Sequence, residues 1–201
     1  MANCSYLFLS ETEPVRRDAT EVHPMRHIST ARHDIPFAFK VLLSGNPKAI
    51  HSPRGGARKT FNLIGNRQLG LGQLAAFLSR IHVPQARQVI DDTLSLLNKP
   101  EHESTFFVLD PVEVFDLTQE SHTRQVHLLM DEINNIASTY EYEFARLTQH
   151  LGPITLGPDV MPGFIAKLFG AKQRPAMQVP FPEPLYRFEQ AGLINWHGCG
   201  D

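Results

Sequence analysis

Histidine and cysteine are the side chains in this sequence whose types could bind a metal. Ten histidines occur among 201 residues. His23 and His27 are four positions apart, a spacing that places two imidazoles on one face of a helix. Pro24 lies between them and would interrupt that helix. His197 and Cys199 could hold a metal from one side, but no second pair has ligand spacing. The sequence therefore favours structural or exposed histidines and predicts no metal site and no cofactor.

A glycine-rich basic stretch, Gly55–Thr60, is the candidate for phosphate binding. A phosphate-binding loop of the P-loop type needs Gly directly before its Lys, a strand before the loop and a helix after it. Here Arg58 precedes Lys59, and an extended segment follows. No aromatic residues accompany the stretch as a stacking platform for nucleic acid. The pattern therefore indicates a basic surface loop, and nucleic acid is not the favoured partner.

No residue has the sequence surroundings of an activated nucleophile. A Gly-x-Ser-x-Gly elbow is absent from the sequence. Cys4 is expected in or beside a buried strand, where a thiol is usually inert. Cys199 has His197 two residues away, yet a position so close to the end of the chain makes a poor active site. We therefore expect no catalytic residues and a protein that is not an enzyme.

The element expected to position the other segments is one long helix over Ser121–Leu151. Ser121 can cap its first turn, and Gly152-Pro153 supplies a stop signal. A repeat of this length also occurs in coiled-coil seams, but the mixture of Ala, Tyr and Phe with aliphatic residues favours a central helix of a globular domain. Spacings of four and three alternate along its apolar stripe: Val126, Met130, Ile133, Ala137, Tyr140, Phe144, Leu147 and Leu151.

The shorter elements are expected to pack against this helix as a small sheet and a helical hairpin. Residues 11–32 and 48–59 are polar or basic and indicate loops. The fold class predicted is α+β and predominantly helical. The expected elements are buried strands near residues 5–10 and 105–109, a short strand at 60–64, a helix capped by Asp34 with Ile35 and Pro36 in its first turn, and a hairpin of helices over 71–82 and 84–98.

The sequence predicts a single domain over residues 1–151 and an extension over residues 152–201. The extension holds seven prolines and seven glycines. Because aromatic residues and leucines recur in it, we expect the extension to wrap on the domain rather than to be disordered. No apolar run approaches the length that crosses a bilayer, and no signal peptide is recognisable. A cytoplasmic location, with reduced cysteines and no membrane partner, is therefore expected.

Acidic charge is concentrated in residues 100–150, which carry ten acidic and two basic residues, a net charge of −8. Residues 1–60 carry a net charge of +4. A rigid acidic helix face with an accessible tyrosine is typical of a protein-binding surface, although a merely solvated face is the more common case. The candidate partner-binding residues lie beside the apolar stripe of the long helix: Asp131, Glu132, Glu141, Tyr142 and Glu143.

Two N-terminal motifs resemble a bacterial family. Residues 1–8 read MANCSYLF and residues 34–47 read DIPFAFKVLLSGNP. Members of that family often begin MANRSYLY and carry IPLxFxxLLSGNP, so Cys4 departs from the pattern, where Arg is expected. The resemblance covers about twenty positions, all in the first quarter of the chain. It carries no catalytic assignment.

The members of that family resemble accessory proteins of bacterial competition systems, and the small, acidic-faced build is similar to that of immunity proteins. The resemblance implies an immunity protein that binds and neutralises a cognate toxin, a secreted effector with a basic surface. One alternative is a small-molecule- or metal-binding domain, or an enzyme, with a histidine-containing pocket between the long helix and the tail. A nucleic-acid module using the basic N-terminal third is the other.

Overall fold

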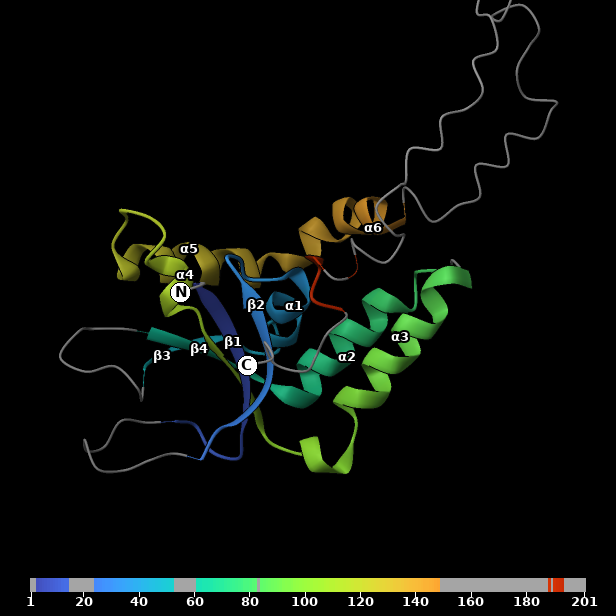
Figure 1. Cartoon of the computed structure of the whole chain (residues 1–201), viewed down its shortest axis with the longest axis horizontal. Helices are drawn as coiled ribbons and strands as arrows, with labels where there is room; N and C mark the ends of the chain where they lie inside the picture. Colours follow the sequence, from blue (N-terminus) through green and yellow to red (C-terminus); the bar gives the residue numbers. More distant parts are fainter. Residues whose placement is uncertain are drawn as a thin grey trace, which may run out of the picture.

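The computed structural model describes residues 3–14, 24–52, 61–82, 84–148, 188 and 190–193. These residues form an α+β fold, in which a five-stranded antiparallel sheet packs against helices (Figure 1). Within the described residues, no helix combines the length and the apolar character needed to cross a membrane. The α+β class predicted from the sequence is confirmed.

The sheet has the strand order β2-β1-β5-β4-β3, and every neighbouring pair is antiparallel. β5, predicted from the sequence as a buried strand, lies in the middle of the sheet and is apolar on both faces. Leu109 faces the main core and Val108 faces a second, smaller cluster on the other side of the sheet. The strands are β1 (Cys4–Ser10), β2 (Arg26–Arg32), β3 (Lys48–His51), β4 (Phe61–Asn66) and β5 (Phe106–Asp110).

Both edge strands lie in segments that the sequence predicts as loops, so those two predictions are wrong. β2 falls within the expected loop 11–32 and β3 within the expected loop 48–59. Ile28 is the only large apolar residue of β2, and it is buried. An edge strand needs main-chain partners on one side only, so polar and charged side chains suffice there and leave no apolar alternation to recognise.

The other regular elements in the described residues are helices and short 3₁₀ turns. Most of the core lies between the sheet and three of them, α1, α2 and α5. The helices are α1 (Phe37–Leu43), α2 (Arg67–Leu78), α3 (Pro84–Leu97), α4 (Val112–Phe115), α5 (His122–Asn134) and α6 (Tyr140–Thr148), with 3₁₀ turns η1 (Pro100–His102) and η2 (Ile136–Thr139).

α1 is enclosed on nearly all sides, since every residue in it except Lys40 is buried. The prediction that Asp34 caps this helix is wrong in detail. Pro36 is the N-cap, with ψ at 151°, and Asp34 accepts a hydrogen bond at 2.7 Å from the amide of Ile35, ahead of the helix. The turn before α1 is therefore stabilised by Asp34, while the helix itself begins at Phe37.

Two glycines let α1 approach its neighbours closely. A Cβ at Gly65 in β4 would overlap the carbonyl oxygen of Leu43, and a Cβ at Gly70 in α2 would overlap that of Leu42. α1 also contacts β5 and α5. α1 therefore occupies the middle of the helical layer, the position predicted from the sequence for the segment 121–151.

The single helix predicted over Ser121–Leu151 is wrong, because the described part of this segment is divided into α5, η2 and α6. Asn135 separates the first two pieces, with φ at −103° and ψ at 14°. Its side-chain amide donates to the carbonyl of Asp131 at 2.8 Å, and the hydroxyl of Ser138 donates to the carbonyl of Asn135 at 2.7 Å. Side chains that bond to the local backbone in this way compete with the helical hydrogen-bond ladder.

The break moves the apolar stripe by one residue. Ile136 is buried, whereas Ala137, which the predicted stripe includes, is exposed. The stripe then resumes with Tyr140 and Leu147, both packed in the core. The spacings of four and three between apolar residues therefore hold on each side of the break. They belong to two separate helices and not to one continuous helix.

The predicted helical hairpin is confirmed as α2 and α3, which lie side by side in Figure 1. The side chain of Asn66 caps α2 by accepting a hydrogen bond at 3.0 Å from the amide of Leu69. α2 ends at Leu78, four residues before the predicted end at His82. α3 begins at Pro84, as predicted, because proline needs no amide partner in the first turn.

The described part of the predicted extension packs into the main core. Phe188 is 0% exposed and Leu193 is 2% exposed. The hydroxyl of Thr93 in α3 donates a hydrogen bond to the carbonyl oxygen of Leu193 at 2.7 Å. The amide of Ala38 in α1 donates a hydrogen bond to the carbonyl oxygen of Ala191 at 2.8 Å. Residues 149–187, 189 and 194–201 lie outside the described part of the chain, and so does most of the predicted extension.

Candidate functional site

The five predicted partner-binding residues lie on α5 and α6, which follow one another along the top of the molecule in Figure 1. α5 is held by Val126, Leu129 and Ile133, which are all buried. The hydroxyl of Ser121 accepts a hydrogen bond from the amide of Arg124, which confirms the predicted N-cap. The exposed face of α5 is therefore presented on a helix that the core fixes in place.

Tyr140 anchors α6 to the same core. Its ring lies 5.1 Å from that of Phe77 in α2 and 6.0 Å from that of Phe37 in α1, both in edge-on geometry. Burial raises the pKa of the Tyr140 hydroxyl above its ordinary value. Tyr140 is thus a packing residue, and two positions further along the chain Tyr142 exposes 70% of its surface.

Glu132 forms an ion pair within the protein. One of its carboxylate oxygens lies 2.6 Å from Nζ of Lys40, the one residue of α1 that is not buried. The Lys40 side chain is only 18% exposed. Because this pair neutralises Glu132 locally and ties α5 to α1, the role of Glu132 is first of all structural.

The two glutamates of α6 are also paired. Glu141 lies 2.6 Å from Arg80, which follows α2, and the guanidinium of Arg80 stands 5.3 Å from the ring centre of Phe144. Glu143 lies 2.7 Å from Nε of Arg146, and its side chain is only 15% exposed. Glu141 remains accessible to a partner, whereas Glu143 faces partly inward.

Asp131 and Tyr142 are the two predicted residues that are both exposed and without an ion pair to any described side chain. The structure adds Leu128, which exposes 53% of its surface one turn before Asp131. Leu128 is not among the partner-binding residues predicted from the sequence. It could have been found, because Leu128 lies outside the stripe that includes Val126 and Met130, and a large aliphatic residue on the polar face of a helix is unusual.

Of the histidines and cysteines considered for a metal site, the structure describes only some, among them His27, His122 and Cys4. Among the described residues, no group of three or more His, Cys, Asp or Glu side chains is arranged to hold a metal ion. Nε2 of His27 lies 2.7 Å from the hydroxyl of Thr30, and Nε2 of His122 lies 2.9 Å from a carboxylate oxygen of Asp116. The predicted candidates that fall outside the described residues are His23, His197, Cys199 and the stretch Gly55–Thr60.

Cys4 begins β1 and is 5% exposed, as the sequence predicts. Its amide donates at 3.0 Å to one carboxylate oxygen of Glu113, and the hydroxyl of Tyr6 donates at 3.0 Å to the other. Burial and this carboxylate raise the pKa of Tyr6 to about 12. A neutral tyrosine that donates to a carboxylate fixes α4 on the end of β1, so this cluster is structural.

A family described as Domain of unknown function (DUF7822) matches residues 13–151, which is more than half of the chain. No curated protein and no solved structure matches the chain. The matched residues include the helices that carry the candidate surface.

Proposed function

We propose that this chain, which belongs to the family of domains of unknown function DUF7822, is a cytoplasmic immunity protein that binds and neutralises a cognate bacterial toxin by direct contact. The observation that carries the proposal is Tyr142, which holds 70% of its surface in solvent on a helix whose other face is anchored in the core. Tyrosine is enriched among the residues that dominate protein–protein binding energies, because it offers a large contact area with few rotatable bonds.

Two further exposed residues lie on α5, the helix that precedes α6 in the chain. Leu128 supplies apolar area, and Asp131 supplies a carboxylate that forms no ion pair with a described side chain. We name the set Leu128, Asp131 and Tyr142 the α5–α6 surface. An apolar contact, an aromatic contact and a free charge together match the mixed composition of non-obligate interfaces, in which a few residues carry most of the affinity.

The charge distribution favours a basic partner. Residues 100–150 carry a net charge of −8, and this segment includes α5 and α6. A field of one sign over one part of a surface speeds the association of an oppositely charged protein and weakens as salt is added. The favoured partner is therefore a toxin domain with a basic surface, such as one that acts on nucleic acid or on an anionic substrate.

Co-expression tests this function. The chain is expressed together with each toxin domain encoded next to its gene, and growth and co-purification are measured. Wild type and the control variant Leu69→Ala, which alters an exposed leucine on α2, are expected to restore growth and to co-purify with the toxin. Tyr142→Ala is expected to lose both, since loss of a central aromatic contact costs about 2 kcal/mol or more, roughly 30-fold in affinity. Neutralisation of no neighbouring toxin by the wild type would refute the proposal.

A small-molecule-binding domain is the second candidate function, and one observation favours it. His82 lines a cavity between α2 and α3, which is a different place from the pocket predicted between the long helix and the tail. Metal analysis of the purified chain separates the two forms of this candidate: a stoichiometric metal supports metal-dependent chemistry, whereas its absence leaves recognition by side chains alone.

A further inference from the structure

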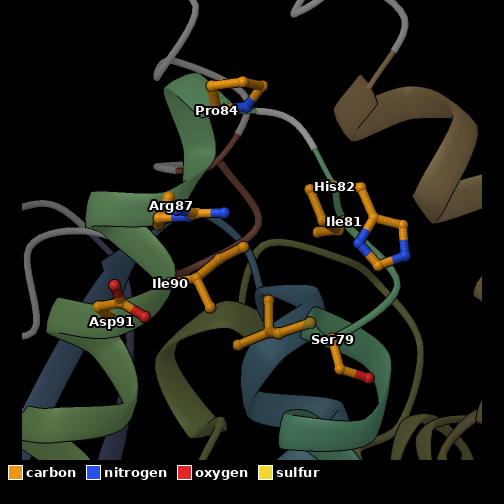
Figure 2. A pocket seen from close by; sticks show the side chains of 8 residues that line it. Ser79, Ile81, His82, Pro84, Arg87, Ile90 and Asp91 are labelled. Carbon is orange, nitrogen blue, oxygen red and sulfur yellow. The ribbon is translucent and has the colours of Figure 1, made fainter.

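The cavity between α2 and α3 has a volume of about 210 Å³. It lies where α2 ends and α3 begins, so the two helices and the short connection between them form its walls. Figure 2 shows Arg87 and Ile90 projecting from α3 on one side and Ser79, Ile81 and His82 on the other. Because pockets for drug-sized ligands are typically about 300–1,000 Å³, this one suits a smaller molecule.

The cavity has an apolar part and a charged part. Leu78 and Ile81 line it and are almost fully buried, and Ile90 is partly buried beside them. Arg87 and Asp91 line it as well, and both are exposed. A ligand that fits must therefore carry an aliphatic group together with polar or charged groups.

Arg87 and Asp91 are four residues apart on α3, the spacing at which helical ion pairs commonly form. No ion pair at 4 Å or less joins them, however, and neither pairs with another described side chain. Both charges are thus available to a ligand that presents the opposite charges a short distance apart. Exposed pairs at this spacing are weak even when they form, so a ligand displaces little by inserting between them.

We propose that this cavity binds a small α-amino acid with an aliphatic side chain. The guanidinium of Arg87 receives the carboxylate, in the two-pronged geometry that arginine offers to carboxylates. Asp91 receives the ammonium group, and the side chain lies among Leu78, Ile81 and Ile90. The inference does not depend on toxin binding; it identifies a ligand class for the second candidate function.

Titration calorimetry with L-leucine tests the proposal on the full-length chain. For the wild type we expect saturable binding with a dissociation constant below about 10 mM. 4-Methylpentanoate, which lacks the ammonium group, and 3-methylbutylamine, which lacks the carboxylate, are each expected to bind about two- to fivefold more weakly, because each loses one charge contact with an exposed side chain. Equal affinity for leucine and either analogue would overturn the proposal.

Matched variants assign the roles. Arg87→Gln and Asp91→Asn are each expected to weaken leucine binding about two- to fivefold, because each removes one charge contact at an exposed position. Two controls are expected to leave it unchanged: Asp92→Asn, which alters the next carboxylate of α3, and Arg124→Gln, which alters an exposed arginine of α5. Circular dichroism checks that each variant is folded.

Chemical shifts of backbone amides locate the bound molecule. Leucine is expected to shift the amides of residues 78–91 and to leave those of α5 in place. No saturable binding by the wild type, or shifts centred elsewhere, would refute the amino-acid site. Neither result would alter the co-expression test of toxin neutralisation, so the two proposals fail separately.

Discussion

Gly70 illustrates how a single residue sets the distance between two helices. A Cβ at this position would overlap the backbone of Leu42 in α1, whereas a Cβ at Gly72, on the same helix, meets nothing within 4 Å. The two glycines of α2 therefore affect stability in opposite ways. Gly70 is required by packing, and Gly72 only costs helix propensity.

We predict that Gly70→Ala lowers the free energy of unfolding by about 1–3 kcal/mol, because the overlap is with backbone that cannot rotate away. Gly72→Ala is the matched control and should raise it by about 0.5–1 kcal/mol. Urea unfolding of both variants measures the difference. Equal effects of the two substitutions would contradict the close packing of α1 on α2.

Tyr6 makes the stability of the N-terminal strand dependent on pH. Its pKa in the folded protein is about 12, against an ordinary value of 10.0, through burial first and the hydrogen bond to Glu113 second. Because the folded pKa is the higher one, its contribution is complete below pH 10 and is lost as the pH rises toward 12.

We therefore predict that the stability difference between wild type and Tyr6→Phe shrinks as the pH rises from about 10 to about 12. Urea unfolding at a series of pH values gives this difference directly. In Glu113→Gln, which removes the carboxylate charge, ultraviolet titration of tyrosinate should show ionisation of Tyr6 at a lower pH. A difference that stays constant across the window would contradict the assigned contact.

At the scale of elements, the sequence predicts those helices and strands whose apolar side chains are buried in the core. β5 and the helical hairpin are correct because apolar side chains must be buried and their periodicity follows from that. β2 and β3 are missed because edge strands are specified by main-chain pairing with β1 and β4, which leaves little trace in local sequence. The division between α5 and α6 is missed because no Pro or Gly marks it, and Asn135 acts through its own side-chain hydrogen bond.

The described C-terminal residues, 188 and 190–193, are part of the fold, because Phe188 and Leu193 are buried in the core. We predict that Phe188→Ala lowers the free energy of unfolding by about 3–5 kcal/mol, as expected for a fully buried aromatic residue. Tyr142→Ala, which truncates an exposed aromatic, is the control and should change it by no more than about 0.5 kcal/mol. Chemical denaturation of both variants measures the two changes. An unchanged free energy of unfolding in Phe188→Ala would show that the segment is not part of the core.

At the scale of the whole molecule, the acidic surface is less charged than the sequence suggests. The number of acidic residues in 100–150 can be counted from the sequence. The sequence does not show that Lys40 pairs with Glu132 and Arg80 with Glu141, because these partners are far apart in the chain. Those partners are brought in by the packing of α1 and α2, so the candidate site narrows to the α5–α6 surface only once the fold is known.

The measurement that tests the immunity proposal most directly is the affinity of the purified chain for its neutralised toxin domain at several salt concentrations. We predict that the double variant Asp131→Lys, Tyr142→Ala binds at least about 100-fold more weakly and depends less on salt, because it loses both a central aromatic contact and a steering charge. Glu143→Gln, at a partly inward carboxylate, should retain nearly the affinity of the wild type. An unchanged affinity and salt dependence in the double variant would contradict the assignment of the α5–α6 surface.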